Sequence, residues 1–85
     1  MSMDRDIVLE KVRSHLATEL GVDAGSITDE THFRDDLEAD SLDLYELVME
    51  LEDTYGVKMS EQEADGIVTV GQAVDFVAAR ADAPA

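Results

Sequence analysis

The sequence predicts a small all-α protein, a four-helix bundle with three longer helices, one short helix and a long first loop. Apolar residues recur every three or four positions in three segments, which is the period of a helix face packed on a core. Two motifs typical of helix capping precede the last two helical segments, and no segment alternates like a half-buried strand. For 85 residues we expect one domain over 1–85, with a core at about 4–79 and a frayed tail at 80–85.

The first helix is expected from about Asp4 to Leu20, because Val8, Val12, Leu16 and Leu20 fall four residues apart on one stripe, which Ile7 and Leu9 widen. Gly21 then favours its termination. Residues 22–39 form a long polar connection, and a loop of this length inside a small domain is usually functional or held by its own apolar side chains. The residues predicted to hold it are Val22, Ile27, Phe33 and Leu37.

The second helix is predicted to begin at Asp40, which can cap it, with Ser41 at the first helical position and Asp43 favourably placed in the first turn. Gly56 ends it. Its apolar stripe has the three- and four-residue spacing of a core face. The stripe consists of Leu44, Leu47, Val48, Leu51 and Tyr55.

Two capping boxes mark the remaining helices. Ser60 with Glu63 opens a short helix that reaches about Asp65, and Thr69 with Gln72 opens the last one. The inward stripe of the last helix consists of Val70, Ala73, Val74 and Val77.

The charge balance limits the possible functions. Twenty-one acidic and six basic residues give a net charge of -15, which repels nucleic acids and anionic membranes and attracts basic protein surfaces. There is no cysteine, hence no disulfide, thiolate metal site or thiol nucleophile. With no apolar signal segment or membrane-length run, we expect a cytoplasmic monomer without a membrane span. A domain of this size also lacks room for a deep catalytic cleft, which argues against an enzyme.

The most informative segment surrounds Ser41. Alone, Asp40-Ser-Leu-Asp is only a helix start, but it follows Phe33-Arg-Asp-Asp-Leu-Glu-Ala and precedes Glu46-Leu-Val-Met-Glu-Leu-Glu. This context resembles the attachment region of acyl carrier proteins, most closely the discrete carriers of bacterial fatty acid synthesis. The resemblance runs from Val8 to about Val77. It includes Leu20-Gly-Val, Tyr55-Gly-Val-Lys and Thr69-Val-Gly-Gln-Ala-Val-Asp-Phe-Val.

The resemblance implies that Ser41 carries 4′-phosphopantetheine, with Asp40 and Leu42 completing the cofactor site. A phosphopantetheinyl transferase would deliver the group from coenzyme A with magnesium. Acyl groups would ride on its thiol as thioesters, and the chain itself would catalyse nothing. The Glu46-Leu-Val-Met stretch favours fatty acid biosynthesis, and a polyketide or other specialised acyl pathway is the alternative.

Between Asp29 and Asp53 the chain has eleven acidic residues and one base, Arg34. Acids interspersed with apolar residues on one helix suit a docking surface, since charges steer encounter and apolar anchors supply contact energy. The expected partners are the transferase, a ketosynthase, an acyltransferase, a ketoreductase and related enzymes, each through a basic patch. The predicted docking residues are Asp43, Tyr45, Glu46, Met49, Glu50, Glu52 and Asp53.

An acyl chain gains roughly 0.8 kcal/mol for each CH₂ that is buried, so we expect it to enter the bundle beside Ser41, between the second and third helices. We expect Leu44, nearest to Ser41 on the inward stripe, to form the constriction. The predicted lining consists of Leu44, Leu47, Val48, Leu51, Met59, Ala64 and Ile67.

Some features depart from the family pattern. Many relatives have glycine at the position of Glu38, and smaller residues at those of Leu44 and Tyr45.

An acidic divalent-cation-binding module is the alternative outside the carriers, but the acids lack EF-hand spacing, and no metal ligands are predicted. A serine hydrolase is disfavoured because Ser41 lacks a Gly-x-Ser-x-Gly elbow.

Overall fold

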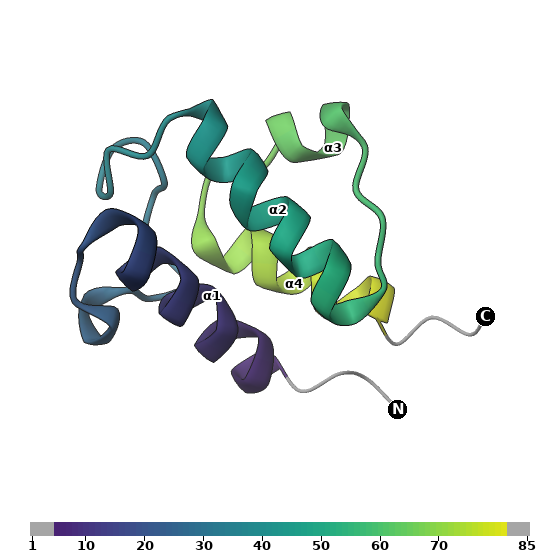
Figure 1. Cartoon of the computed structure of the whole chain (residues 1–85), viewed down its shortest axis with the longest axis horizontal. Coiled ribbons are helices and arrows are strands. Elements are labelled where there is room, and N and C mark those ends of the chain that lie inside the picture. The colour runs from purple at the N-terminus through teal and green to yellow at the C-terminus, as the bar shows by residue number, and fades with distance from the viewer. Residues whose placement is uncertain (1–4, 82–85) are drawn as a thin grey trace.

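The structure is a computed structural model that describes residues 5–81, and it confirms the predicted helical bundle (Figure 1). The three longer helices are α1 (Arg5–Leu20), α2 (Ser41–Tyr55) and α4 (Val70–Ala81). The short helix is α3 (Glu61–Asp65), and a 3₁₀ turn, η1 (Ala24–Ser26), interrupts the first loop. Among residues 5–81 the only β-type pairing is an isolated bridge between His32 and Thr69.

The core forms where the inward stripes of α1, α2 and α4 meet. Of the predicted stripe of α1, Val8, Val12 and Leu16 are buried, while Leu9 and Leu20 are half-buried and Ile7 is exposed. The inward residues of α4 are all buried. Leu44 and Tyr55, predicted to face the core from the second helix, are half-buried and pack against the edge of this core. The most deeply buried large side chains are Val8, Val12, Leu16, Ile27, Leu47, Leu51, Val70, Val74 and Val77.

Local capping fixes the helix starts, as the sequence predicts. At α2 the Asp43 N–H donates to Asp40 Oδ1 (2.9 Å), and the Asp40 N–H donates to Asp43 Oδ2 (3.2 Å). The same reciprocal pair joins Ser60 and Glu63 at α3. These bonds satisfy N–H groups that a helix leaves without partners, so each start is defined by its own first turn.

The last helix is two residues longer than predicted. Arg80, which the sequence places in the frayed tail, belongs to α4. Its guanidinium donates to Glu63 Oε2 (2.7 Å) and lies over the Phe76 ring, 4.5 Å from the ring centre. Arg80 therefore ties the end of α4 to α3, while residues 82–85 of the predicted tail lie outside the described residues.

The long first loop is held against the start of α4. Ile27 and Phe33, two of the residues predicted to hold it, are buried, and Val22 and Leu37 are half-buried. The Phe33 N–H donates to Val68 O (3.0 Å), which pairs the loop with the segment between α3 and α4. This pairing brings residues 32–39 next to α2 and α3, where they form one wall of a cavity beside Ser41.

None of the helices described between residues 5 and 81 combines the length and apolarity needed to cross a membrane.

Candidate functional site

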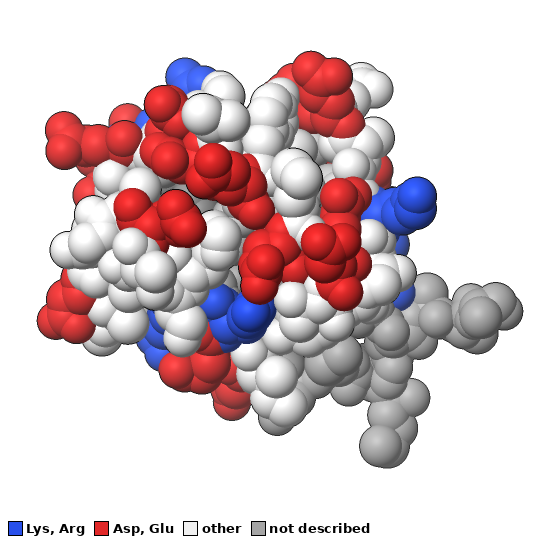
Figure 2. All heavy atoms as spheres, viewed as in Figure 1, with Lys and Arg blue, Asp and Glu red and all other residues white. Residues whose placement is uncertain are grey.

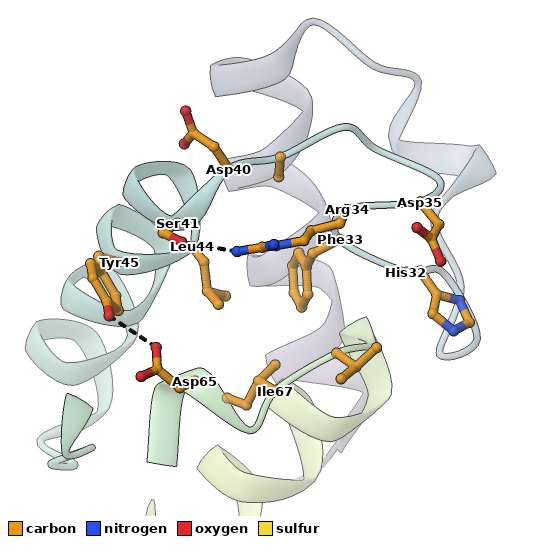
Figure 3. Close-up of a pocket in the computed structure, with 12 residues that line it drawn as sticks. His32, Phe33, Arg34, Asp35, Asp40, Ser41, Leu44, Tyr45, Asp65 and Ile67 are labelled. Atoms are coloured by element: carbon orange, nitrogen blue, oxygen red, sulfur yellow. Dashed lines mark hydrogen bonds between the residues drawn. The ribbon is translucent and has the colours of Figure 1, made fainter. Parts of the chain in front are cut away.

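Ser41 presents an exposed hydroxyl at the first position of α2. The capping box uses the N–H groups of Asp40 and Asp43, so those of Ser41 and Leu42 remain at the positive end of the helix dipole. Arg34 Nη2 donates a hydrogen bond to Ser41 Oγ at 3.1 Å (Figure 3). The hydroxyl is thus accessible and lies among groups that attract an anion.

Nested backbone hydrogen bonds hold the turn of residues 32–39, which carries Arg34. The N–H groups of Asp36 and Leu37 both donate to His32 O, at 3.0 and 3.2 Å. The next two N–H groups donate to Arg34 O and Phe33 O, at 3.1 and 2.8 Å. Because the Phe33 side chain is also buried in the core, the turn fixes the Arg34 backbone beside the start of α2.

A cavity of about 220 Å³ opens beside Ser41, between this turn, α2 and the segment after α3. In Figure 3 the apolar side chains of Phe33, Leu44 and Ile67 point into it. Polar groups share the lining with them. The lining residues are His32, Phe33, Arg34, Asp35, Ala39, Asp40, Ser41, Leu44, Tyr45, Asp65, Ile67 and Val68.

Two of the seven residues predicted to line an acyl pocket, Leu44 and Ile67, line this cavity. The other five, Leu47, Val48, Leu51, Met59 and Ala64, are buried in the core cluster and do not line it. The sequence reasoning missed Phe33, Arg34 and Asp65 because tertiary contacts alone bring them to α2. The sequence carried two signals, the apolar character of Phe33 within a polar loop and the position of Arg34 as the lone base among many acids.

Tyr45, predicted to dock partners, forms part of the cavity wall. Its hydroxyl donates to Asp65 Oδ1 at 3.0 Å, linking α2 to the end of α3 (Figure 3). This hydrogen bond to the carboxylate, with a smaller contribution from desolvation, raises the pKa of Tyr45 above its ordinary value.

The acids of α2 divide into two groups. Three of the predicted docking residues have intramolecular roles: Asp43 closes the capping box, Glu50 pairs with Lys11 (2.8 Å), and Glu52 accepts the Met59 N–H (2.8 Å). The hydrogen bond from Lys11 lowers the pKa of Glu50.

No cluster of three or more His, Cys, Asp or Glu residues suited to a metal occurs among residues 5–81.

The other predicted docking residues of α2, Glu46, Met49 and Asp53, are exposed, and the two carboxylates bond to no other described residue. With Leu42 they follow the helix at positions 42, 46, 49 and 53, which places them on one face. We call Leu42, Glu46, Met49 and Asp53 the α2 stripe. Figure 2 shows acidic side chains over the side of the molecule on which α2 lies.

Glu38 occupies a backbone conformation that favours glycine, with φ of 54°. A side chain costs roughly 1–2 kcal/mol in this left-handed region, whereas glycine adopts it without that cost. We expect Glu38→Gly to be more stable than Glu38→Ala by about 1 kcal/mol in urea unfolding, because both remove the charge and only glycine removes Cβ. Equal stabilities would contradict a strained backbone here.

Comparisons with known proteins agree with the geometry. Residues 10–77 match the family described as phosphopantetheine attachment site. The chain is 52% identical over 75 residues to an acyl carrier protein of Rubrobacter xylanophilus, covering 88% of this chain and 93% of that protein. Its structure resembles the acyl carrier protein from Enterococcus faecalis with a TM-score of 0.79 and 40% identity, covering 92% of this chain and 99% of the other. The chain belongs to the acyl carrier protein family, whose members carry 4′-phosphopantetheine and are carriers rather than enzymes.

Proposed function

We propose that the chain carries acyl intermediates of fatty acid biosynthesis as thioesters on a 4′-phosphopantetheine arm attached to Ser41. The observation that carries this proposal is the exposed Ser41 hydroxyl at the start of α2, beside a cavity with apolar side chains and within the motif that resembles the attachment region. Asp40 positions this serine through the capping box, and Leu42 follows it with an exposed side chain.

The residues present fit the prosthetic group. A phosphodiester on Ser41 Oγ would lie next to the N–H groups of Ser41 and Leu42, where the dipole of a 15-residue helix favours negative charge. The group supplies the thiol on which acyl chains form thioesters, and the polypeptide contains no cysteine of its own. The exposed position of Ser41 leaves such an arm free to reach a partner enzyme or to fold back.

The cavity beside Ser41 supports the proposal that the acyl chain is buried inside the protein. Leu44 lies on α2 one helical turn after Ser41, is half-buried and faces the cavity. We propose that Leu44 is the constriction and that the chain passes it toward Leu47, Val48, Leu51, Met59 and Ala64. These five residues pack in the closed core of the structure, so the core must open to admit the chain.

The α2 stripe is the proposed docking surface for acyl-processing enzymes. Its exposed carboxylates would meet the basic patches of the transferase, ketosynthase, acyltransferase and ketoreductase, and Leu42 and Met49, 64% and 62% exposed, would supply apolar contact. Because the carrier must visit several enzymes in turn, the proposal includes that it is a monomer in the cytoplasm.

Charge reversal in the α2 stripe should weaken docking. We expect Glu46→Lys to raise the Kd for a ketosynthase about tenfold, mainly by slowing association, because attraction to a basic patch becomes repulsion. Surface plasmon resonance at 50 and 300 mM salt measures this effect. Glu19→Lys, an equal charge change at an exposed site on α1, is the control. Equal losses in both variants would reduce the effect to net charge.

Reconstitution of chain elongation tests the pathway. Holo protein loaded with a malonyl group is mixed with the condensing and reducing enzymes of bacterial fatty acid synthesis, and in parallel with a polyketide ketosynthase. We expect saturated chains to lengthen on the protein in the first mixture. Elongation only with the polyketide ketosynthase would move the carrier to the alternative pathway and leave its role as a carrier intact.

A further inference from the structure

The charge around Ser41 poses an electrostatic problem for an attached phosphodiester. Asp40 and Asp43 flank the serine, and the interval from Asp29 to Asp53 contains eleven acidic residues. A negative phosphate placed there is repelled by its surroundings, and the two first-turn N–H groups offset only part of this repulsion.

Arg34 is the one Lys or Arg between Asp29 and Asp53. The contacts of its side chain differ from those of the other described arginines. Its guanidinium donates to the neutral Ser41 hydroxyl, and it forms no ion pair with any carboxylate in the part of the chain from residue 5 to residue 81. The other described arginines, Arg5, Arg13 and Arg80, each pair with an acid. The positive charge of Arg34 is therefore not matched by a direct partner, and it lies at the atom that would bear the phosphate.

From these observations we infer that Arg34 binds the phosphate of the 4′-phosphopantetheine arm. This inference rests on the proposed attachment to Ser41. A non-bridging phosphate oxygen is two bonds from Oγ, so Arg34 Nη2, already 3.1 Å from Oγ, needs little movement to reach it. Guanidinium groups suit phosphates because they offer several N–H donors in one plane.

The binding has a structural consequence for the arm. The nested hydrogen bonds of residues 32–39 hold the Arg34 backbone, so the guanidinium anchors the phosphate end of the arm to the cavity wall. An anchored phosphate directs the remainder of the arm from a fixed point beside the cavity. Because Arg34 is exposed, the contact is sensitive to salt.

Phosphorus and arginine NMR of the holo protein test this inference. Wild type, Arg34→Gln, Arg34→Lys and Lys58→Gln are loaded with a transferase and coenzyme A, and intact mass confirms one group per chain. Lys58→Gln is the matched control, since it removes the same charge from an exposed site beyond the opposite end of α2. Amide spectra verify that each variant is folded.

In the wild type we expect the Arg34 Nε–H signal to move downfield on loading and to return toward its apo position in 1 M salt. The ³¹P signal should shift, and its relaxation should approach that of a freely moving phosphodiester, in Arg34→Gln but not in Lys58→Gln. Arg34→Lys should fall between, because it keeps the charge and loses the planar donors. Identical ³¹P shift and relaxation in wild type, Arg34→Gln and Lys58→Gln would overturn the inference while the mass gain still supports attachment. Absence of any mass gain in the wild type would overturn the proposed function and this inference with it.

Discussion

Ser41→Ala should abolish loading. After incubation with a phosphopantetheinyl transferase and coenzyme A, the wild type should gain one prosthetic group and Ser41→Ala none, a loss limited only by the sensitivity of mass spectrometry. The reason is chemical, because the phosphodiester requires the Ser41 oxygen and alanine offers no atom to accept it. The folded state should change little, since the side chain is exposed and its one hydrogen bond is to an exposed arginine.

Ser14→Ala is the matched control, since it removes an exposed hydroxyl from α1. It should load at the wild-type rate. Circular dichroism should show equal helix content in all three proteins. Loading of a folded Ser41→Ala variant would refute the attachment site, and equal slowing in Ser14→Ala would show that the effect is not local.

An octanoyl chain on the arm should stabilise the fold strongly. Burial gains roughly 0.8 kcal/mol per CH₂, so sheltering four of them contributes about 3 kcal/mol, or roughly 12–24 °C in Tm for a domain of this size. The matched control is the acetyl form, which has the same thioester and almost no apolar chain. Differential scanning calorimetry of holo, acetyl and octanoyl protein measures the effect. Equal Tm values for the acetyl and octanoyl forms would contradict burial of the chain.

The same experiment tests Leu44 as the constriction. In Leu44→Ala the gain in Tm should continue to longer chains than in the wild type, because the side chain that narrows the cavity is shortened. Leu20→Ala is the control, since it makes the same truncation at another half-buried leucine, which lies at the end of α1 and does not line the cavity. It should lower every Tm by a similar amount. Unchanged chain-length dependence in Leu44→Ala would exclude this residue as the constriction and leave burial itself untouched.

The helices and their starts were predictable because their causes are local. Ser60 with Glu63 and Thr69 with Gln72 are three residues apart, so a capping box can be recognised in the sequence alone. The inward stripes were predictable for the same reason, because helical periodicity places them. The 3₁₀ turn at Ala24–Ser26 was missed because its only marks are Asp23 and Gly25, which are common in any loop.

The partners of the site residues were not predictable, because they are distant in sequence. The Tyr45–Asp65 hydrogen bond spans 20 residues, and it turns a predicted docking residue into part of the cavity wall. The pair of Lys11 with Glu50 likewise depends on how α1 packs on α2. Arg34 appeared in the sequence only as a lone base, and its contact with Ser41 depends on the fold of residues 32–39.

Localisation of the prosthetic group in the wild-type protein tests the central claim most directly. The chain is incubated with a transferase, coenzyme A and magnesium, digested, and analysed by tandem mass spectrometry. We predict one phosphopantetheine per chain, found only on the peptide that contains Ser41, with fragment ions that place it on this residue. A group on Ser14, Ser26 or Ser60, or a wild-type chain that gains no group at all, would contradict the account.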